Sequence, residues 1–218
     1  AQRRSPPRTL SCEPMNRASA WLLVTEFVQD PGLRRHMLAV EAAVRSYARK
    51  LGGDEERWGA IGLIHDFDWE IHADLDRHPM EGEKILRARG VDEAIIRTLL
   101  SHYTEGTGVA RELPVDFALL ACDEITGLIS ASALVRPSKD IREMDVKSVQ
   151  KKWKLTNFAA GVHRDGVEAA TADFSRACFD GQLALWDHVG NVLAAMQGAA
   201  AALGLDGRLA APTQENTP

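Results

Sequence analysis

The sequence has little of what marks a disulfide-rich, membrane-spanning or nucleic-acid-binding protein. Its three cysteines lie far apart, which excludes a structural zinc finger and fits a reducing cytoplasm. No apolar run approaches the roughly 20 residues needed to cross a bilayer, so we expect no membrane span. A net charge of −5 gives no basic surface for a nucleic-acid polymer.

Strand patterns are also absent, because no segment alternates apolar and polar residues for long enough to indicate a β-strand. Helix signals follow one another instead. They are N-caps, first-turn prolines and glycine stops, at Asp30–Pro31, Gly52–Gly53, Asp54, Pro79 and Pro114. We therefore expect an all-α protein.

The domain organisation follows from length and composition. At 218 residues, 45% of them hydrophobic, the chain is long enough for one sizeable core. Residues 1–14 are rich in proline and arginine and read as a disordered leader or cloning remnant, with Met15 as a natural start. We expect one helical domain over residues 15–204 and a disordered tail over residues 205–218. The alanine-rich end of the domain predicts one or two further helices, with aromatic residues in the core or at a homodimer contact: Phe174, Phe179 and Trp186.

Histidines and one aspartate suggest a metal site. Asp123 lies inside the apolar stretch DFALLACDEITGLI, where a bare carboxylate would be costly without a cation or several hydrogen-bond donors. A metal ion is the economical explanation, and several helices could each deliver one or two ligands to it. Four histidines fall near predicted helix ends or turns: His36, His65, His78 and His102.

The order of His36, the adjacent His65–Asp66 pair and Asp123 resembles the signature of the HD-domain superfamily of metal-dependent phosphohydrolases. The likeness runs from about residue 33 to residue 166 and includes GLIHD, HPMEG and LLSH; the stretch from ALVRP to GVHRDG resembles a bacterial group of small HDIG-type hydrolases. The resemblance implies an HD-domain helical bundle around one or two divalent ions. The first ion would take His36, His65, Asp66 and Asp123. The second would take His78, His102 and a bridging Asp66.

The resemblance also implies a reaction. A metal-activated hydroxide would hydrolyse a small phosphorylated metabolite or nucleotide, either a phosphomonoester or a phosphodiester. Imidazole-rich ligation favours iron or manganese, with zinc, cobalt, nickel and magnesium as alternatives. Asp66 would bridge the ions, while Asp68 and Glu70 of HDFDWE could orient water or protonate the leaving group.

Three basic residues that follow Asp123 are candidates for binding the substrate's phosphate: Arg136, Lys139 and Lys147. The later lysines of KSVQKKWK are expected in solvent on an amphipathic helix. The remaining histidines match no element of the metal pattern, and we expect structural roles for them: His72, His163 and His188.

Two other functions stay open. The superfamily also contains mixed-valent di-iron oxygenases with a similar six-residue ligand set, and non-catalytic modules that keep the helical fold with a metal. Specificity for cyclic dinucleotides is not supported, because Trp69 stands where the HD-GYP phosphodiesterases have lysine and SHYTEGTGV lacks the GYP element.

Overall fold

A computed structural model describes residues 15–209, and within that range the chain is all-α without a β-strand, as the sequence predicts. The predicted leader, residues 1–14, and residues 210–218 lie outside the described range. The helices are α1 (Arg17–Phe27), α2 (Pro31–Leu51), α3 (Glu55–Ile64), α4 (Met80–Ala88), α5 (Glu93–Ser101), α6 (Thr104–Thr107), α7 (Pro114–Leu134), the 3₁₀ helix η1 (Ile141–Glu143), α8 (Val146–Trp153), α9 (Arg164–Cys178) and α10 (Leu185–Gly198).

The predicted helix boundaries are confirmed. Asp30 caps α2 by accepting a hydrogen bond of 2.6 Å from the Leu33 N–H, and Pro31 is the first helical residue. Gly52 ends α2 in the left-handed conformation, with φ of 69°. Asp54 caps α3 in turn, and helices begin beside Pro79 and at Pro114.

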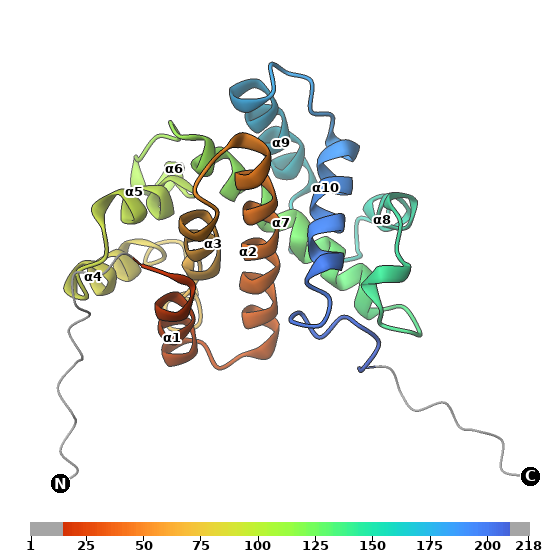
Figure 1. The fold of residues 1–218 in the computed structure, drawn as a ribbon, viewed down its shortest axis with the longest axis horizontal. Coiled ribbons are helices and arrows are strands. Elements are labelled where there is room, and N and C mark those ends of the chain that lie inside the picture. The colour runs from red at the N-terminus through yellow and green to blue at the C-terminus, as the bar shows by residue number, and fades with distance from the viewer. Residues whose placement is uncertain (1–14, 210–218) are drawn as a thin grey trace, which may run out of the picture.

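Helices α2, α3 and α7 form the centre of the molecule (Figure 1). On one side α1 packs on α3, and α4 and α5 pack on each other; on the other side α9 packs on α7 and α10 packs on α2. The buried aromatic ring of Tyr47 in α2 packs edge-on against Phe174 of α9, with ring centroids 4.8 Å apart. Phe174 also packs against Phe179, so one predicted aromatic residue lies in the core and a second, partly buried, packs against it.

The third predicted aromatic position, Trp186, packs edge-on against Trp153 of α8 at 5.6 Å between centroids. The predicted amphipathic helix is α8, and Lys151 and Lys154 are exposed there, as expected. Lys152, also expected in solvent, is instead half-buried, with its Nζ 4.8 Å from the centroid of the Phe158 ring.

Helix α7 corrects the expectation that no apolar run is long enough for a bilayer. It spans 21 residues and, by length and composition alone, could cross a membrane. Its apolar surface is instead buried between α2, α8 and α9 at the centre of the bundle, so this composition is that of a core helix.

The folded part of the chain also extends beyond the expected boundary at residue 204. Leu205 is fully buried and its carbonyl accepts a hydrogen bond of 2.8 Å from the Ile141 N–H. Asp206 forms an isolated antiparallel bridge with Asp140. This short segment is held by the turn that follows α7, a contact that its composition does not indicate.

Candidate metal centre

Five segments of the chain bring the predicted ligands to one place. His36 comes from the first half of α2, and Asp123 comes from the middle of α7. The His65–Asp66 pair follows the last turn of α3, with His65 as its C-cap. The remaining two ligands come from the α4–α5 side: His78 from the turn before α4 and His102 from the C-cap of α5.

The first group consists of His36, His65, Asp66 and Asp123, whose nearest ligand atoms all lie within 4.8 Å of one another. Nε2 of His36 lies 3.0 Å from Oδ1 of Asp123 and 3.2 Å from Nε2 of His65. Nε2 of His65 lies 3.3 Å from Oδ2 of Asp66. Two imidazoles and two carboxylates thus converge on one point.

The second group consists of Asp66, His78 and His102, and it shares Asp66 with the first. Oδ1 of Asp66 lies 3.3 Å from Nε2 of His78 and 3.7 Å from Nε2 of His102, while Oδ2 faces the first group. The carboxylate therefore presents one oxygen to each group, which is the arrangement expected of a bridging ligand.

Backbone carbonyls fix the ring orientation of two of the histidines. Nδ1 of His65 donates to the Gly62 carbonyl at 2.9 Å, and Nδ1 of His102 donates to the Leu99 carbonyl. Both acceptors lie in the preceding helical turn. A proton on Nδ1 leaves a neutral ring with its lone pair on Nε2, so both rings point a metal-binding nitrogen into the centre.

Side chains, rather than backbone carbonyls, fix the orientation of the other two rings, those of His78 and His36. Nδ1 of His78 lies 2.8 Å from Oδ1 of Asp68, a buried acceptor. The Thr126 hydroxyl donates to the Asp123 carbonyl at 2.7 Å, so it is free to accept from Nδ1 of His36 at 3.3 Å. Such outer contacts fix the tautomer and raise the basicity of metal-binding histidines.

The donor set fits divalent metal ions. Four Nε2 lone pairs face each other in pairs, 3.2 Å apart within each group, and face the carboxylates of Asp66 and Asp123. Lone pairs at this separation repel unless a cation or a proton lies between them. The mixture of imidazole and carboxylate suits transition metals better than magnesium or calcium.

The close packing of imidazoles and carboxylates shifts the pKa values of the cluster residues. Burial lowers the pKa of His65, but Asp66 and Asp123 more than offset that effect and hold it well above its usual value. Burial likewise lowers the pKa of His78, and hydrogen bonds to neighbouring carboxylates raise it to about 9. Burial raises the pKa of Asp66, yet the histidines around it hold this pKa well below its usual range. Positive charge is therefore favoured at the centre.

An open cavity of about 690 Å³ adjoins the cluster. Its wall includes both aromatic and charged side chains, and Trp69 packs edge-on over His78 with ring centroids 5.1 Å apart. The cluster residues that face this cavity are Asp66, His78, His102 and Asp123. A small molecule can therefore reach the shared carboxylate and both groups of ligands.

The structure gives Asp68 and Glu70 positions different from the expected catalytic ones. Asp68 is 1% exposed, lies behind His78 and does not line the large cavity. Glu70 is exposed and accepts hydrogen bonds of 2.7 and 2.9 Å from the N–H groups of Gln29 and Asp30, just before α2. Asp68 thus orients the candidate ligand His78, and Glu70 holds the start of the helix that carries His36.

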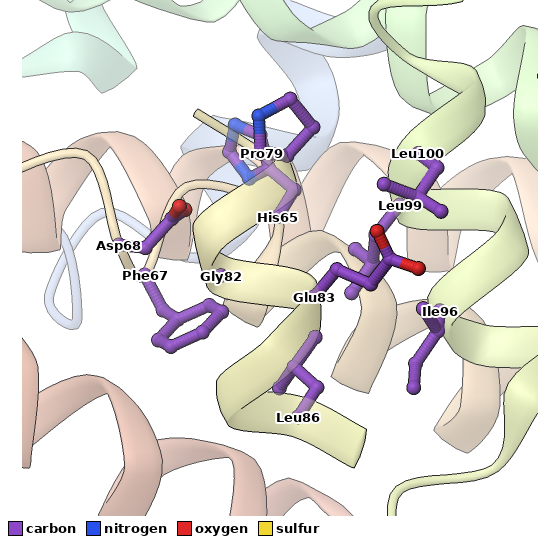
Figure 2. A pocket seen from close by; sticks show the side chains of 10 residues that line it. All are labelled: His65, Phe67, Asp68, Pro79, Gly82, Glu83, Leu86, Ile96, Leu99 and Leu100. Carbon is purple, nitrogen blue, oxygen red and sulfur yellow. The ribbon is translucent and has the colours of Figure 1, made fainter. Parts of the chain in front are cut away.

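Close packing of α4 against Asp68 explains why the HPMEG motif ends in a glycine, Gly82. A side-chain Cβ at this position would lie 2.5 Å from Oδ2 of Asp68, so only glycine lets α4 pass this close. Figure 2 shows Asp68 beside Gly82, with Phe67 and Leu86 below. The cavity drawn there is about 10 Å³, room for no more than one water molecule, so it is not the substrate site.

The predicted phosphate ligands are not brought to the centre, which corrects their assignment. Leu134 ends α7 eleven residues after Asp123, a rise of about 16 Å, and Arg136 follows it. Arg136 pairs with Glu143 at 3.4 Å, and the exposed Lys147 lies on α8. None of the three candidates, Arg136, Lys139 and Lys147, lines the large cavity.

The remaining histidines lie outside both groups. His188 is fully buried; its Nδ1 accepts from the Tyr47 hydroxyl at 2.6 Å and its Nε2 donates to the Ala121 carbonyl at 2.8 Å, a structural role. His163 lines the large cavity and is bound by Glu124, a position that the sequence reading did not identify. Arg111 was missed too, because it lies in the irregular segment between α6 and α7.

A helical bundle with a His-Asp pair at its centre, and a carboxylate shared by two groups of possible metal ligands, defines a class of domain that can bind metal. The HD domain model matches residues 33–147, more than half of the chain, and the chain therefore belongs to the HD-domain family. No curated protein and no solved structure significantly matches the sequence. The HD-domain family is generally one of metal-dependent hydrolases, and the cluster supplies the ligand groups that such an activity requires.

Proposed function

We propose that the protein is a metal-dependent phosphohydrolase that cleaves a small phosphorylated metabolite or nucleotide, as a phosphomonoesterase or a phosphodiesterase. The observation that carries the proposal is the division of the Asp66 carboxylate between two groups of imidazoles, one oxygen facing each. Two-metal phosphatases use a shared carboxylate to keep their ions close together.

The residues of this chain would hold two divalent ions. His36, His65 and Asp123 supply the first with Asp66; His78 and His102 supply the second with Asp66. When bound, such ions supply Lewis acidity, which lowers the pKa of water and neutralises the charge of a phosphate. Iron and manganese suit this ligand set best, and zinc, cobalt, nickel and magnesium are the alternatives to test.

The protein's own contribution is preorganisation. Fixed Nδ1 contacts keep the Nε2 atoms of His36 and His78 aimed at the centre before any ligand binds. Trp69 and Tyr103 supply aromatic surface to the cavity wall, and Trp69 packs edge-on against His78. The cavity size suits a small organic phosphate as substrate.

The same four imidazoles and two carboxylates also fit the oxygenase alternative, because mixed-valent di-iron enzymes of this superfamily use a similar set. The two functions differ in what they consume. An oxygenase would show an optical band from its di-iron centre and take up oxygen when substrate is added. A phosphohydrolase would release phosphate or a phosphomonoester without oxygen.

Elemental analysis of protein purified without added metal, followed by a panel of phosphate esters with each candidate ion, tests the proposal. We expect up to two ions per chain and hydrolysis that is lost with a chelator and restored by one ion. Full metal content with no turnover across the panel, under air and without oxygen uptake, would instead indicate a binding module.

A further inference from the structure

Arg111 is the single arginine or lysine that lines the large cavity within residues 15–209. It lies between α6 and α7 and shares the cavity wall with Asp66, His78 and His102. Its position could not be inferred from spacing along a helix, because residues 109–113 follow no helical period.

The guanidinium of Arg111 is held beside the second group of ligands. Nη1 donates to the Ser101 carbonyl at 3.1 Å and to the Thr104 hydroxyl at 2.9 Å. Ser101 directly precedes His102, so the charged end of Arg111 is tied to the turn that carries a metal ligand. This contact fixes where the positive charge lies without neutralising it.

The charge of Arg111 has no carboxylate partner among the described residues, unlike that of most arginines in this chain. Nε and Nη2 form no hydrogen bond within residues 15–209, although the side chain is partly buried. Arg136, by contrast, is engaged by Glu143. A partly buried guanidinium with free donors is suited to a planar, bidentate contact with a phosphate.

Carboxylates also line the cavity at Glu105, Glu124 and Asp173, and Glu124 binds His163. Glu105 directly follows Thr104, whose hydroxyl accepts a hydrogen bond from Arg111. Because these carboxylates repel an anion, Arg111 and any ions held by the two ligand groups are the attractive positions for a phosphate in this cavity.

We propose that Arg111 binds a phosphate oxygen of the substrate, next to the group formed by His78 and His102. This inference rests on the proposed phosphohydrolase function, and it replaces Arg136 and its neighbours as the residues that recognise the phosphate.

Binding of inorganic phosphate to the metal-loaded protein, measured by calorimetry, tests the assignment without requiring turnover. Arg111→Gln should weaken binding by about tenfold to a hundredfold, because a hydrogen bond to an ion is lost. Arg111→Lys should lie between, since it keeps the charge without the fork. Arg136→Gln is the matched control and should bind phosphate like the wild type.

Metal content and melting temperature are measured on the same samples. If Arg111→Gln folds poorly, Arg111→Lys is used in its place. Weaker phosphate binding by Arg111→Lys than by the wild type, at full metal content, then supports the assignment. Equal phosphate binding by wild type and both Arg111 variants would overturn the role of Arg111 and leave the phosphohydrolase proposal standing. Absence of phosphate binding by the metal-loaded wild type would also overturn the role of Arg111, and the panel of phosphate esters decides the phosphohydrolase proposal separately.

Discussion

His78 and Asp68 form a buried hydrogen bond, with ring Nδ1 and carboxylate Oδ1 separated by 2.8 Å. The pair links the imidazole of a candidate metal ligand to a carboxylate that does not line the large cavity. We therefore predict that Asp68→Ala weakens metal binding by the second group by about tenfold to a hundredfold, the usual effect of losing such an outer contact. Titration of the metal-free protein with one ion measures this change.

Glu70→Gln is the control for that experiment, since both residues belong to HDFDWE. Glu70 contacts the N–H groups of Gln29 and Asp30 rather than a ligand. We expect normal metal stoichiometry and a modest loss of stability of about 1 kcal/mol. Loss of metal by Glu70→Gln but not by Asp68→Ala would reverse the two roles.

The two ligand groups predict distinct metal stoichiometries. His102→Ala should reduce bound metal from two ions per chain to one, because it removes one ligand of the second group only. Asp66→Ala and His65→Ala should abolish hydrolysis, and Asp66→Ala should impair both groups. Elemental analysis measures the number of metal ions per chain in each variant, and His72→Ala, outside both groups, is the control. Unchanged stoichiometry in His102→Ala would show a mononuclear centre.

Gly82→Ala should destabilise the protein although alanine is the better helix former. Its methyl group would collide with Oδ2 of Asp68, and such overpacking costs about 1–3 kcal/mol. The matched control is Gly127→Ala in α7, where the nearest atom to the new Cβ lies at 3.8 Å and no loss is expected. Urea unfolding compares the two, and equal stabilities would contradict the close approach of α4.

Because His188 is buried, we predict that the free energy of unfolding depends on pH. This contribution comes from His188 itself and is separate from that of the candidate metal ligands. Burial lowers its pKa to about 4, below the unfolded value near 6.5, so the unfolded chain binds the proton more tightly. Stability from this group is complete above pH 6.5 and is lost as pH falls toward 4. Between pH 7 and pH 5 the free energy of unfolding should fall by about 2 kcal/mol more in the wild type than in His188→Gln. Parallel urea titrations of both proteins, matched in metal content, measure the difference.

Much of the fold was predictable, because its signals are local. Asp30 and Pro31 start α2 and Gly52 ends it through interactions within a few residues of the chain. The burial of Leu205 could not be predicted, because its carbonyl is held by Ile141, which is distant in the sequence. A tertiary contact of this kind leaves no periodic pattern.

The candidate ligands could be grouped from the sequence through the resemblance of their order and flanking residues to the HD-domain signature. The residues that surround the ligands could not be predicted in this way. Arg136 is close to Asp123 in sequence but lies beyond the end of a straight helix that carries it away from the cavity. Arg111 is brought to the cavity by an irregular segment, and such a segment has no period from which a direction can be read.

Asp66 lies between two parts of the molecule. The first ligand group lies on or beside the core helices α2, α3 and α7, whereas His78 and His102 lie on the segment that contains α4 and α5. This segment packs on α3 and α7 through α5, and the ion pairs Arg57–Asp92 and Arg97–Asp116 join it to the core helices. A second ion would therefore act as a cross-link that closes a long loop of the chain. A metal ion bound there would make local unfolding of residues 67–113 less frequent, so proteases would cleave this segment more slowly. The centre would then stabilise the fold as well as support a reaction.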